Sequence, residues 1–380
     1  MSASELLNEN IKVLLSEIHQ PYKISVDSPV DLFVDEKLAA HIKSGNQLNF
    51  IMTDNDFYLS VKGVEFNGEY FELRPAQDLS TIKINGGEYR GSLIILYEKN
   101  SLKIINRLSL QDYIKGVMTK EMPVGNGKDT YEALKAFSVC VRTYALMKMR
   151  EQKDYFDVFI DVRDQVYGGV KAESKITNKI VDETENEIIT FNGLPAIVFY
   201  HSTCGGRTEN SINVFNTQND LDYLSGIEDG NPPNCRISPR YQWSEVIPEK
   251  EFLRRLVKNN LIADTNYSIV EFRISERFQS GRIKNLLVIL SDNSSNNIEI
   301  VIPGKSLRSV IRKADNSGIL FSNNFEIKID ESRNVLLNGK GAGHGVGLCQ
   351  WGSIALSKGG LKYDDILKHY FPGTEVIKFE

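Results

Sequence analysis

The feature that most constrains the fold is a change in hydrophobic periodicity near residue 108. Before that point, short apolar runs bounded by turn-forming residues indicate strands. After it, apolar residues recur at helical spacing over 108–122 and 129–150. Strand signals return from Ile188 to His201, and later segments mix both patterns. Because strands and helices come in blocks, the pattern predicts the α+β class.

The domain organisation follows from the same pattern. We expect a β-rich N-terminal region over 1–80 and a mixed α+β core over 81–380, with an inserted β-rich subdomain over 245–335. The length of 380 residues is consistent with two to three domains, at about 150 residues each.

Composition excludes several classes of protein. Lys plus Arg number 45 against 50 Asp plus Glu, a formal net charge of -5, which argues against nucleic-acid binding through bulk charge. The longest apolar runs are strand-sized, so no transmembrane segment is expected. The first residues show neither a basic nor an apolar signal region. Either the protein is cytoplasmic or the chain begins after a removed export signal.

Glu121 is a candidate general acid. Ser109 begins a helix in which Val117 and Met118 belong to the apolar stripe, and Glu121 falls on that stripe. Pro123 requires the helix to end nearby. Desolvation and the negative end of the helix dipole both raise a carboxyl pKa, as a general acid requires. The alternative is a glutamate at a frayed helix end that simply reaches water.

The second helix carries Cys140 on its buried stripe, where we expect a small core side chain without a chemical role. Arg142 lies off the stripe, on the side shared with Lys135. An arginine in that position is usually solvated. It would matter for function only if its side of the helix lined a groove for a polar substrate.

Three cysteines and a histidine form a candidate metal site. His201 and Cys204 have the H-x-x-C spacing that can hold one ion from a turn, and Cys235 and Cys349 could complete a tetrahedral structural zinc site. The chain has no C-x-x-C pair. A Cys204–Cys235 disulfide in an exported protein, or independent buried thiols, are the alternatives.

Glycines alternate around His344, between residues 341 and 347. The segment does not match the G-x-G-x-x-G pattern, and we do not expect it to lead from a clear strand into a helix. A phosphate-binding loop is therefore not predicted. Alternating glycines instead allow close backbone approach, as in a wall against which a bulky ligand lies.

Several segments, taken in order, resemble the stage II sporulation protein D family, which includes the amidase-enhancer proteins. The resemblance covers roughly residues 80–375. Its motifs are Gly116-Val-Met-Thr-Lys-Glu-Met-Pro123, Val141-Arg-Thr-Tyr-Ala145, Tyr200-His-Ser-Thr-Cys-Gly-Gly206, Gly343-His-Gly-Val-Gly347 and His369-Tyr-Phe-Pro-Gly373.

The resemblance implies a peptidoglycan lytic transglycosylase acting in the cell envelope, outside the cytoplasm. Such enzymes cut between N-acetylmuramic acid and N-acetylglucosamine without water and leave a 1,6-anhydro sugar. It implies that the core is a catalytic domain, that Glu121 is the acid/base and that Arg142 orients the site. It also implies a preference for stem-peptide-free glycan. Further candidates for contacting the glycan are Tyr144, Ser202, Thr203, His344 and Gln350.

Zinc in some members of the family supports His201, Cys204 and Cys235 as ligands. The chain departs from the family at Phe137–Cys140, where small residues are usual, and 124–130 lacks a common tryptophan.

Two alternative functions remain open. Some relatives are described as enhancers of an amidase, so one alternative is a non-catalytic cell-wall-binding module with a cell-wall amidase as partner. Another is a zinc hydrolase with His201 or His344 as ligand, although no H-E-x-x-H pattern supports it.

Overall fold

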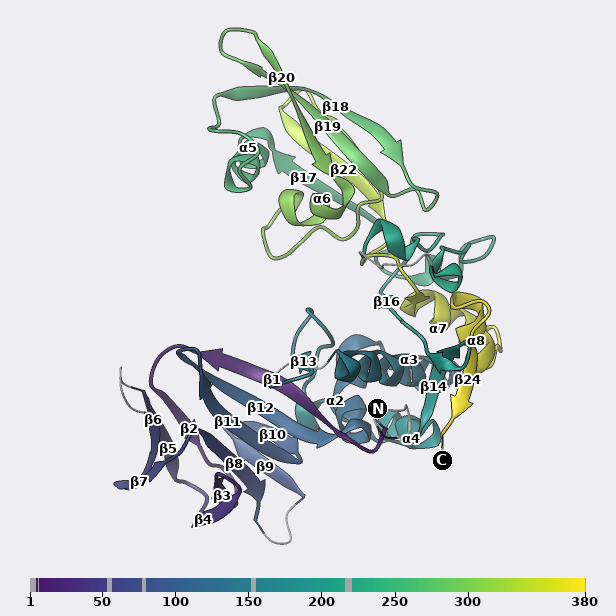
Figure 1. The fold of residues 1–380 in the computed structure, drawn as a ribbon. Coiled ribbons are helices and arrows are strands. Elements are labelled where there is room, and N and C mark those ends of the chain that lie inside the picture. Colours follow the sequence, from purple (N-terminus) through teal and green to yellow (C-terminus); the bar gives the residue numbers. More distant parts are fainter. Residues whose placement is uncertain are drawn as a thin grey trace. The chain divides into compact units, whose positions relative to one another are not determined.

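The computed structural model describes residues 5, 7–52, 57–76, 80–151, 155–215 and 221–379. The chain forms two compact units. Unit 1 contains Met1–Ile197 with Glu375–Glu380, and unit 2 contains Val198–Thr374. Both units contain helices and strands, which confirms the predicted α+β class (Figure 1). The described helices are all too short or too polar to cross a membrane.

A seven-stranded sheet is the framework of unit 1. All its neighbouring strands pair antiparallel except β1 and β13, which are parallel. Its strands, in spatial order, are β13 (Val158–Phe159), β1 (Asn10–Ile18), β12 (Ser101–Ser109), β11 (Ser92–Glu98), β8 (Tyr70–Pro75), β3 (Val30–Val34) and β4 (Lys37–Ile42).

The β11–β12 hairpin lies in the middle of this sheet. It turns at Lys99 and Asn100, which both have positive φ, as the tight turns of two-residue hairpins require. Because β8 pairs directly with β11, the sheet contains strands from both sides of residue 80, where the sequence suggested a division.

Both faces of the hairpin are buried, which explains its unbroken apolar run. Alternate residues of a strand point to opposite faces. Leu93 and Ile95 face a core shared with a second sheet and a hairpin, whereas Ile94 and Leu96 face a smaller cluster with Phe159. The second sheet consists of β2 (Tyr22–Ser25), β5 (Gln47–Met52), β6 (Phe57–Val61) and β7 (Val64–Asn67), and the hairpin of β9 (Thr81–Ile84) and β10 (Gly87–Arg90).

Helices follow the sheet without a linker. Ser109 ends β12 and caps α2 (Leu110–Glu121), because its side chain accepts a hydrogen bond from the Asp112 main-chain N–H. The remaining elements of unit 1 are α3 (Tyr131–Arg150), η1 (Gly169–Ala172), α4 (Lys175–Glu183) and a sheet of β15 (Leu194–Pro195), β14 (Glu187–Phe191) and β24 (Glu375–Lys378). The helices predicted over 108–122 and 129–150 are thus confirmed.

Arg142 is 1% exposed, so the expectation of a solvated side chain is wrong. Helix α4 and strand β14 cover its side of α3. Its guanidinium donates to the main-chain oxygen of Glu187 at 3.0 Å and to Gln111 Oε1 at 3.2 Å. Because these partners belong to β14 and α2, Arg142 ties α3 to both elements.

Unit 2 begins with a strand pair that fixes the glycine segment. β16 (Tyr200–His201) runs parallel to β23 (Leu348–Cys349), which leads into α7 (Gln350–Lys358). The expectation that this segment would not lead from a strand into a helix is wrong, because β22 (Asn334–Lys340) ends directly before Gly341 and α7 begins at Gln350. The other short elements are η2 (Ser211–Asn213), η3 (Asp222–Leu224), η4 (Asn234–Ile237) and α8 (Tyr363–Tyr370).

The alternating glycines allow the close approach that the sequence suggested. Gly341 and Gly343 have φ of +77° and +100°. A Cβ on Gly341 would lie 2.7 Å from Thr203 O, and one on Gly343 would lie 2.8 Å from His201 Cβ. Only glycine combines this conformation with that spacing.

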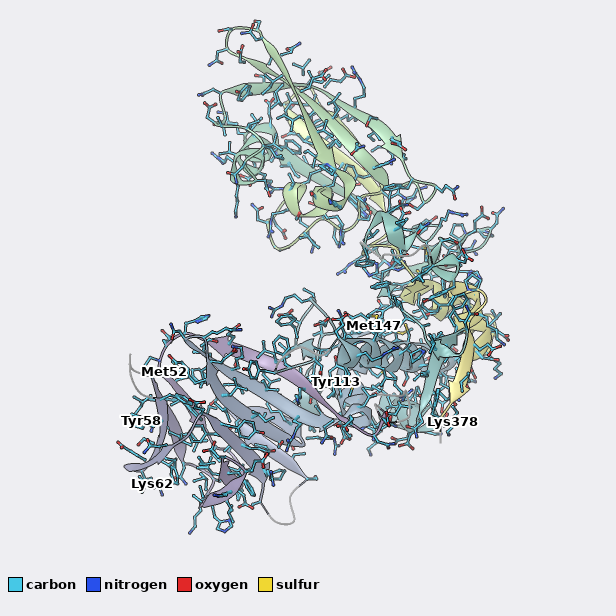
Figure 2. The ribbon with its side chains drawn as sticks, viewed as in Figure 1. Met52, Tyr58, Lys62, Tyr113, Met147 and Lys378 are labelled. Atoms are coloured by element: carbon cyan, nitrogen blue, oxygen red, sulfur yellow. The ribbon has the colours of Figure 1, made fainter. Side chains whose placement is uncertain are left out.

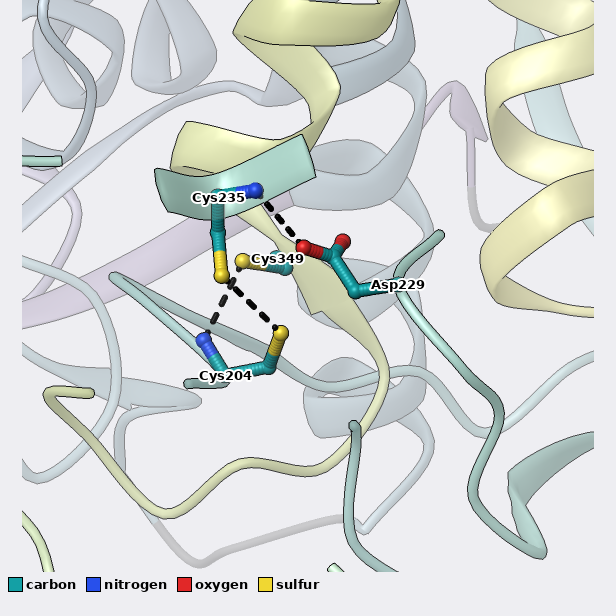
Figure 3. A group of neighbouring side chains, drawn as sticks. All are labelled: Cys204, Asp229, Cys235 and Cys349. Atoms are coloured by element: carbon teal, nitrogen blue, oxygen red, sulfur yellow. Dashed lines mark hydrogen bonds between the residues drawn. The ribbon is translucent and has the colours of Figure 1, made fainter. Parts of the chain in front are cut away.

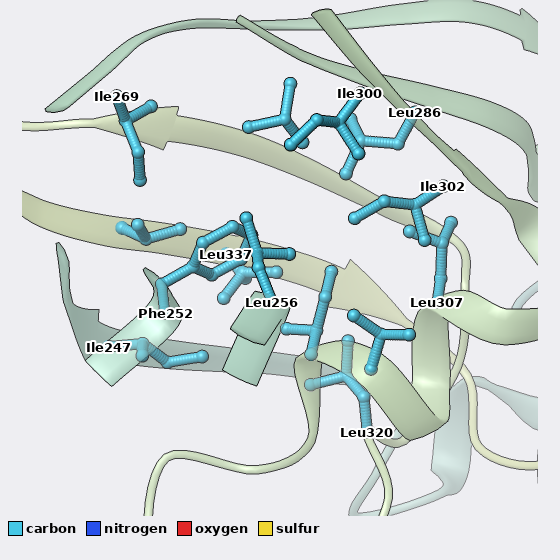
Figure 4. Close-up of a cluster of buried hydrophobic side chains, with 14 of the residues drawn as sticks. Ile247, Phe252, Leu256, Ile269, Leu286, Ile300, Ile302, Leu307, Leu320 and Leu337 are labelled. Atoms are coloured by element: carbon cyan, nitrogen blue, oxygen red, sulfur yellow. The ribbon is translucent and has the colours of Figure 1, made fainter. Parts of the chain in front are cut away.

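A subdomain inside unit 2 has its own core (Figure 4). The chain enters and leaves it side by side, because Gln242 pairs with Lys340. Its two sheets and two helices bury one apolar cluster. The elements are β17 (Gln242–Pro248), α5 (Glu249–Lys258), β18 (Tyr267–Arg277), β19 (Ile283–Asp292), β20 (Asn297–Pro303), α6 (Gly304–Ile311), β21 (Phe325–Ile329) and β22 (Asn334–Lys340).

Phe252→Ala should destabilise this subdomain by about 3–5 kcal/mol, because Phe252 is 1% exposed in the cluster and its truncation leaves a cavity. Val270→Ala, at a side chain that is 50% exposed, is the control and should cost less than about 1 kcal/mol. Urea denaturation followed by the fluorescence of Trp243, in the same cluster, measures both. Equal losses in the two variants would contradict the proposed core.

Candidate active site and metal centre

Glu121 is the last residue of α2. The helix stops there because Met122 is extended before Pro123. Val117 and Met118 are fully buried, as the apolar stripe predicted. Glu121 Oε1 accepts a hydrogen bond from the Val166 main-chain N–H at 2.6 Å. Burial raises the pKa of the Glu121 carboxyl, and the hydrogen bond from Val166 opposes this rise without cancelling it.

Two buried phenols lie near Glu121. The pKa of Tyr113 and that of Tyr144 are both raised, chiefly by burial and further by the negative charges of Asp164 and Glu121. Tyr113, labelled in Figure 2, donates to Gln165 Oε1 at 3.0 Å. Tyr144 donates to Asp164 Oδ1 at 2.9 Å. Both phenols are therefore donors rather than phenolates.

Sequence analysis missed the segment Asp164–Tyr167, which we call the strap. Each of its residues is hydrogen-bonded to the helices or the sheet around Glu121. Gln165 is fully buried, and its Nε2 has no hydrogen-bond partner among the described residues. The strap lies between a two-residue strand and a short 3-10 helix and has no periodic pattern, so the sequence gave no signal for it.

The remaining predicted contacts with the glycan are divided between the units. Tyr144 lies in unit 1, whereas Ser202, Thr203, His344 and Gln350 lie in unit 2. Thr203 is fully buried with its hydroxyl 2.7 Å from Ser238 Oγ, and His344 Nδ1 accepts from the Val346 N–H. These residues stay predictions as substrate contacts, as does the catalytic role of Arg142.

Three thiols and one carboxylate form a buried group in unit 2, which we call the thiol cluster (Figure 3). Its members are Cys204, Asp229, Cys235 and Cys349, and their ligand atoms all lie within 4.8 Å of one another. Glycine turns place Cys204, β23 carries Cys349 and η4 carries Cys235. Cys140 lies apart in the core of α3, as predicted.

Asp229 occupies the place that the sequence assigned to His201. His201 Nδ1 lies 3.0 Å from Val346 O, within hydrogen-bond distance, and the imidazole lies outside the thiol cluster. Asp229 accepts hydrogen bonds from the Cys235 N–H at 2.7 Å and from the Tyr370 hydroxyl at 2.6 Å. A lone aspartate in a loop has no spacing that indicates a ligand, which is why the sequence did not reveal it.

The geometry of the thiol cluster fits a structural zinc ion. Cys204 Sγ and Cys235 Sγ are 3.4 Å apart, too far for a disulfide and near the roughly 3.8 Å of two sulfurs on one tetrahedral zinc. Hydrogen bonds from Cys204 and Cys349 lower the pKa of the Cys235 thiol. Burial, and then the charge on Cys235, raises the pKa of Asp229 to about 7.

Arg282 supports an anionic cluster. Its guanidinium is fully buried and donates to the main-chain oxygens of Cys204 and Arg207. Burial lowers its pKa, and the nearby charges of Glu209 and the cysteines raise it. A buried cation is costly unless negative charge lies close, and thiolates on a metal would supply that charge.

Two family models and several known proteins match this chain. The family model described as "Stage II sporulation protein" matches residues 98–191, and one described as "Domain of unknown function" matches 174–347. An uncharacterized protein of Brachyspira hyodysenteriae is 29% identical over 98% of this chain and 94% of its own length.

Two relatives from Bacillus subtilis carry functional names. The amidase enhancer is 26% identical over 94% of this chain, which spans 54% of that protein, and stage II sporulation protein D is 26% identical over 72% of this chain and 75% of its own length. The first family model covers the segment with Glu121 and the strap. Residues 98–191 of this chain therefore match the stage II sporulation protein family, and the chain as a whole is similar to stage II sporulation protein D and to the amidase enhancer.

Proposed function

We propose that this protein is a peptidoglycan lytic transglycosylase that acts on stem-peptide-free glycan outside the cytoplasm. The observation that carries the proposal is the Glu121 carboxyl, whose pKa is raised by burial at the end of α2 while the strap fixes one of its oxygens. A carboxyl that stays protonated is suited to general acid catalysis.

The contacts indicate which Glu121 oxygen carries the proton. Oε1 accepts from the Val166 N–H, so the acid form holds its proton on Oε2. In the first step, that proton passes to the glycosidic oxygen as the bond to muramic C1 breaks. In the second step, the muramic C6 hydroxyl bonds to C1 and gives its proton back to Glu121. One carboxyl thus serves both steps, and water is not consumed.

The thiol cluster completes the proposal as a structural zinc centre. Cys204, Cys235, Cys349 and Asp229 would hold the ion, with four ligand atoms and a buried surrounding, as in closed structural sites. Zinc bound there would stabilise the fold of unit 2 and would take no part in the chemistry. The zinc-hydrolase alternative loses support because the cluster contains neither His201 nor His344.

A non-catalytic amidase enhancer is the second candidate function. The observation that favours it is the match to the Bacillus subtilis amidase enhancer along 94% of this chain. In that case the protein would bind glycan and a cell-wall amidase, and Glu121 would have no chemical task. Both candidates place the protein in the cell envelope.

Glu121→Gln should abolish cleavage of purified, stem-peptide-free glycan strands, because the amide cannot donate or accept the proton as a carboxyl does. The loss should be about 10²–10⁴-fold. Mass spectrometry of the products measures it, and the wild-type product should carry a 1,6-anhydro end.

The exposed Glu65→Gln, on β7, is the matched control and should cut at the wild-type rate. A product heavier by one water would show hydrolysis and reject the proposed mechanism. Wild-type protein that binds the strands but does not cut them would favour the enhancer.

The raised pKa of Glu121 predicts two pH effects. Cleavage should fall as pH rises through a pKa above the ordinary value of 4.5, because the acid form is lost. Between the two pKa values the folded protein binds more protons than the unfolded chain, so wild-type stability falls as pH rises. Glu121→Gln has no carboxyl to titrate at this position. The melting temperature of the variant minus that of the wild type should therefore increase with pH over that window. A constant difference would contradict the raised pKa.

Protein purified under reducing conditions should contain about one zinc ion per chain, by metal analysis, because the cluster offers four ligands. Cys235→Ser should lose the ion, and Asp229→Asn should bind it more weakly, because each change removes an anionic ligand. His201→Ala should keep the ion. This result would distinguish the ligand set of the structure, which contains Asp229, from the set predicted from the sequence, which contains His201.

Removing the ion with a chelator should lower the melting temperature, since zinc binds only the folded state. A metal-free protein whose mass is two hydrogens lower under oxidising conditions would show the Cys204–Cys235 disulfide instead.

A further inference from the structure

We propose that Asp164 is a positioning residue for Glu121, acting through Tyr144 and the strap. The proposal rests on the function proposed above and adds a residue to that site. Asp164 acts on the groups that hold Glu121 in place.

Asp164 is held in place by two hydrogen-bond donors and a nearby cation. Its side chain is 3% exposed, and both oxygens accept hydrogen bonds, Oδ1 from the Tyr144 hydroxyl at 2.9 Å and Oδ2 from the Phe159 N–H at 2.8 Å. The Lys148 ammonium lies 3.7 Å from Oδ1. A carboxylate with two donors and a nearby cation has a defined orientation even when buried.

The strap carries this orientation to Glu121. Asp164 joins the strap to α3, while Gln165 and Val166 join it to α2 through Tyr113 and Glu121. Tyr167 donates to Asn106 Oδ1, on β12, at 2.8 Å. Only Gln165 lies between Asp164 and Val166, whose N–H meets Glu121 Oε1. A shift of the strap at Asp164 would therefore move that N–H.

Tyr144 connects the two carboxyl groups electrostatically. The charges of Asp164 and Glu121 both raise its pKa, after the larger effect of burial, so the phenol lies within the field of each. Asp164 accepts the phenolic hydrogen bond and so fixes the direction of the Tyr144 hydroxyl. The two carboxyl groups then have separate tasks: Asp164 orients the phenol and the strap, and Glu121 exchanges a proton.

Positioning of this kind predicts a loss in kcat rather than in substrate binding. Asp164→Asn and Tyr144→Phe should each lower kcat on stem-peptide-free glycan by about 10- to 100-fold, with KM unchanged, because small displacements of a catalytic group are costly. The double variant should be no slower than the slower single variant, because both changes act on the same Tyr144–Asp164 contact. A rise in KM with kcat unchanged would make Tyr144 a binding residue and overturn the proposal.

The Val166 amide gives a second measurement, which needs no activity. In wild-type protein its NMR signal should move with pH as Glu121 ionises, and in Glu121→Gln it should not. Asp164→Asn and Tyr144→Phe should lose most of this movement while thermal melting shows a folded protein. Retention of the full movement in both variants would overturn the proposal.

Tyr131→Phe is the matched control. Tyr131 donates to Glu183 Oε1 at 2.7 Å, so the change removes a phenol–carboxylate bond from the other end of the same helix. It should leave both kcat and the Val166 movement at wild-type values. If the wild-type protein cleaves no glycan, the proposed function fails, but the Val166 signal still decides whether Asp164 positions Glu121.

Discussion

Strand β12 passes directly into helix α2 at Ser109, and the geometry of unit 1 depends on this junction. The strand is buried on both faces of the hairpin, so its position is fixed by packing on two sides. The Ser109 cap then sets where the helix begins, and Pro123 sets where it ends. Because both ends of α2 are defined, the position of Glu121 at its last residue is fixed.

The local parts of this structure could be predicted from the sequence. Helix α2 and its glutamate follow from a capping residue, an apolar stripe and a proline, all within fifteen residues of one another. Helix α3, predicted over 129–150, likewise shows directly in its apolar spacing. Such elements need no information about distant residues, because propensity and periodicity are local properties.

The parts that depend on tertiary contacts could not be predicted. Arg142 has a helical position that is usually solvated, and only the packing of α4 and β14 buries it. Asp229 enters the thiol cluster from a loop that no spacing relates to the cysteines. Asp164 meets Tyr144 from twenty residues away in the chain. In each case the deciding contact joins segments whose proximity is a property of the fold.

The adjacent ends of the subdomain within unit 2 have a consequence for how this chain can vary. Gln242 and Lys340 are paired in the β17–β22 ladder. The residues between them therefore form an insertion whose two ends stay together whatever its length. The entropy of closing such a loop changes only slowly with its number of residues. Insertions and deletions there would leave the strand pair at its base in register, so this stretch can diverge in length and surface while Cys235 and Cys349, on either side of it, keep their places.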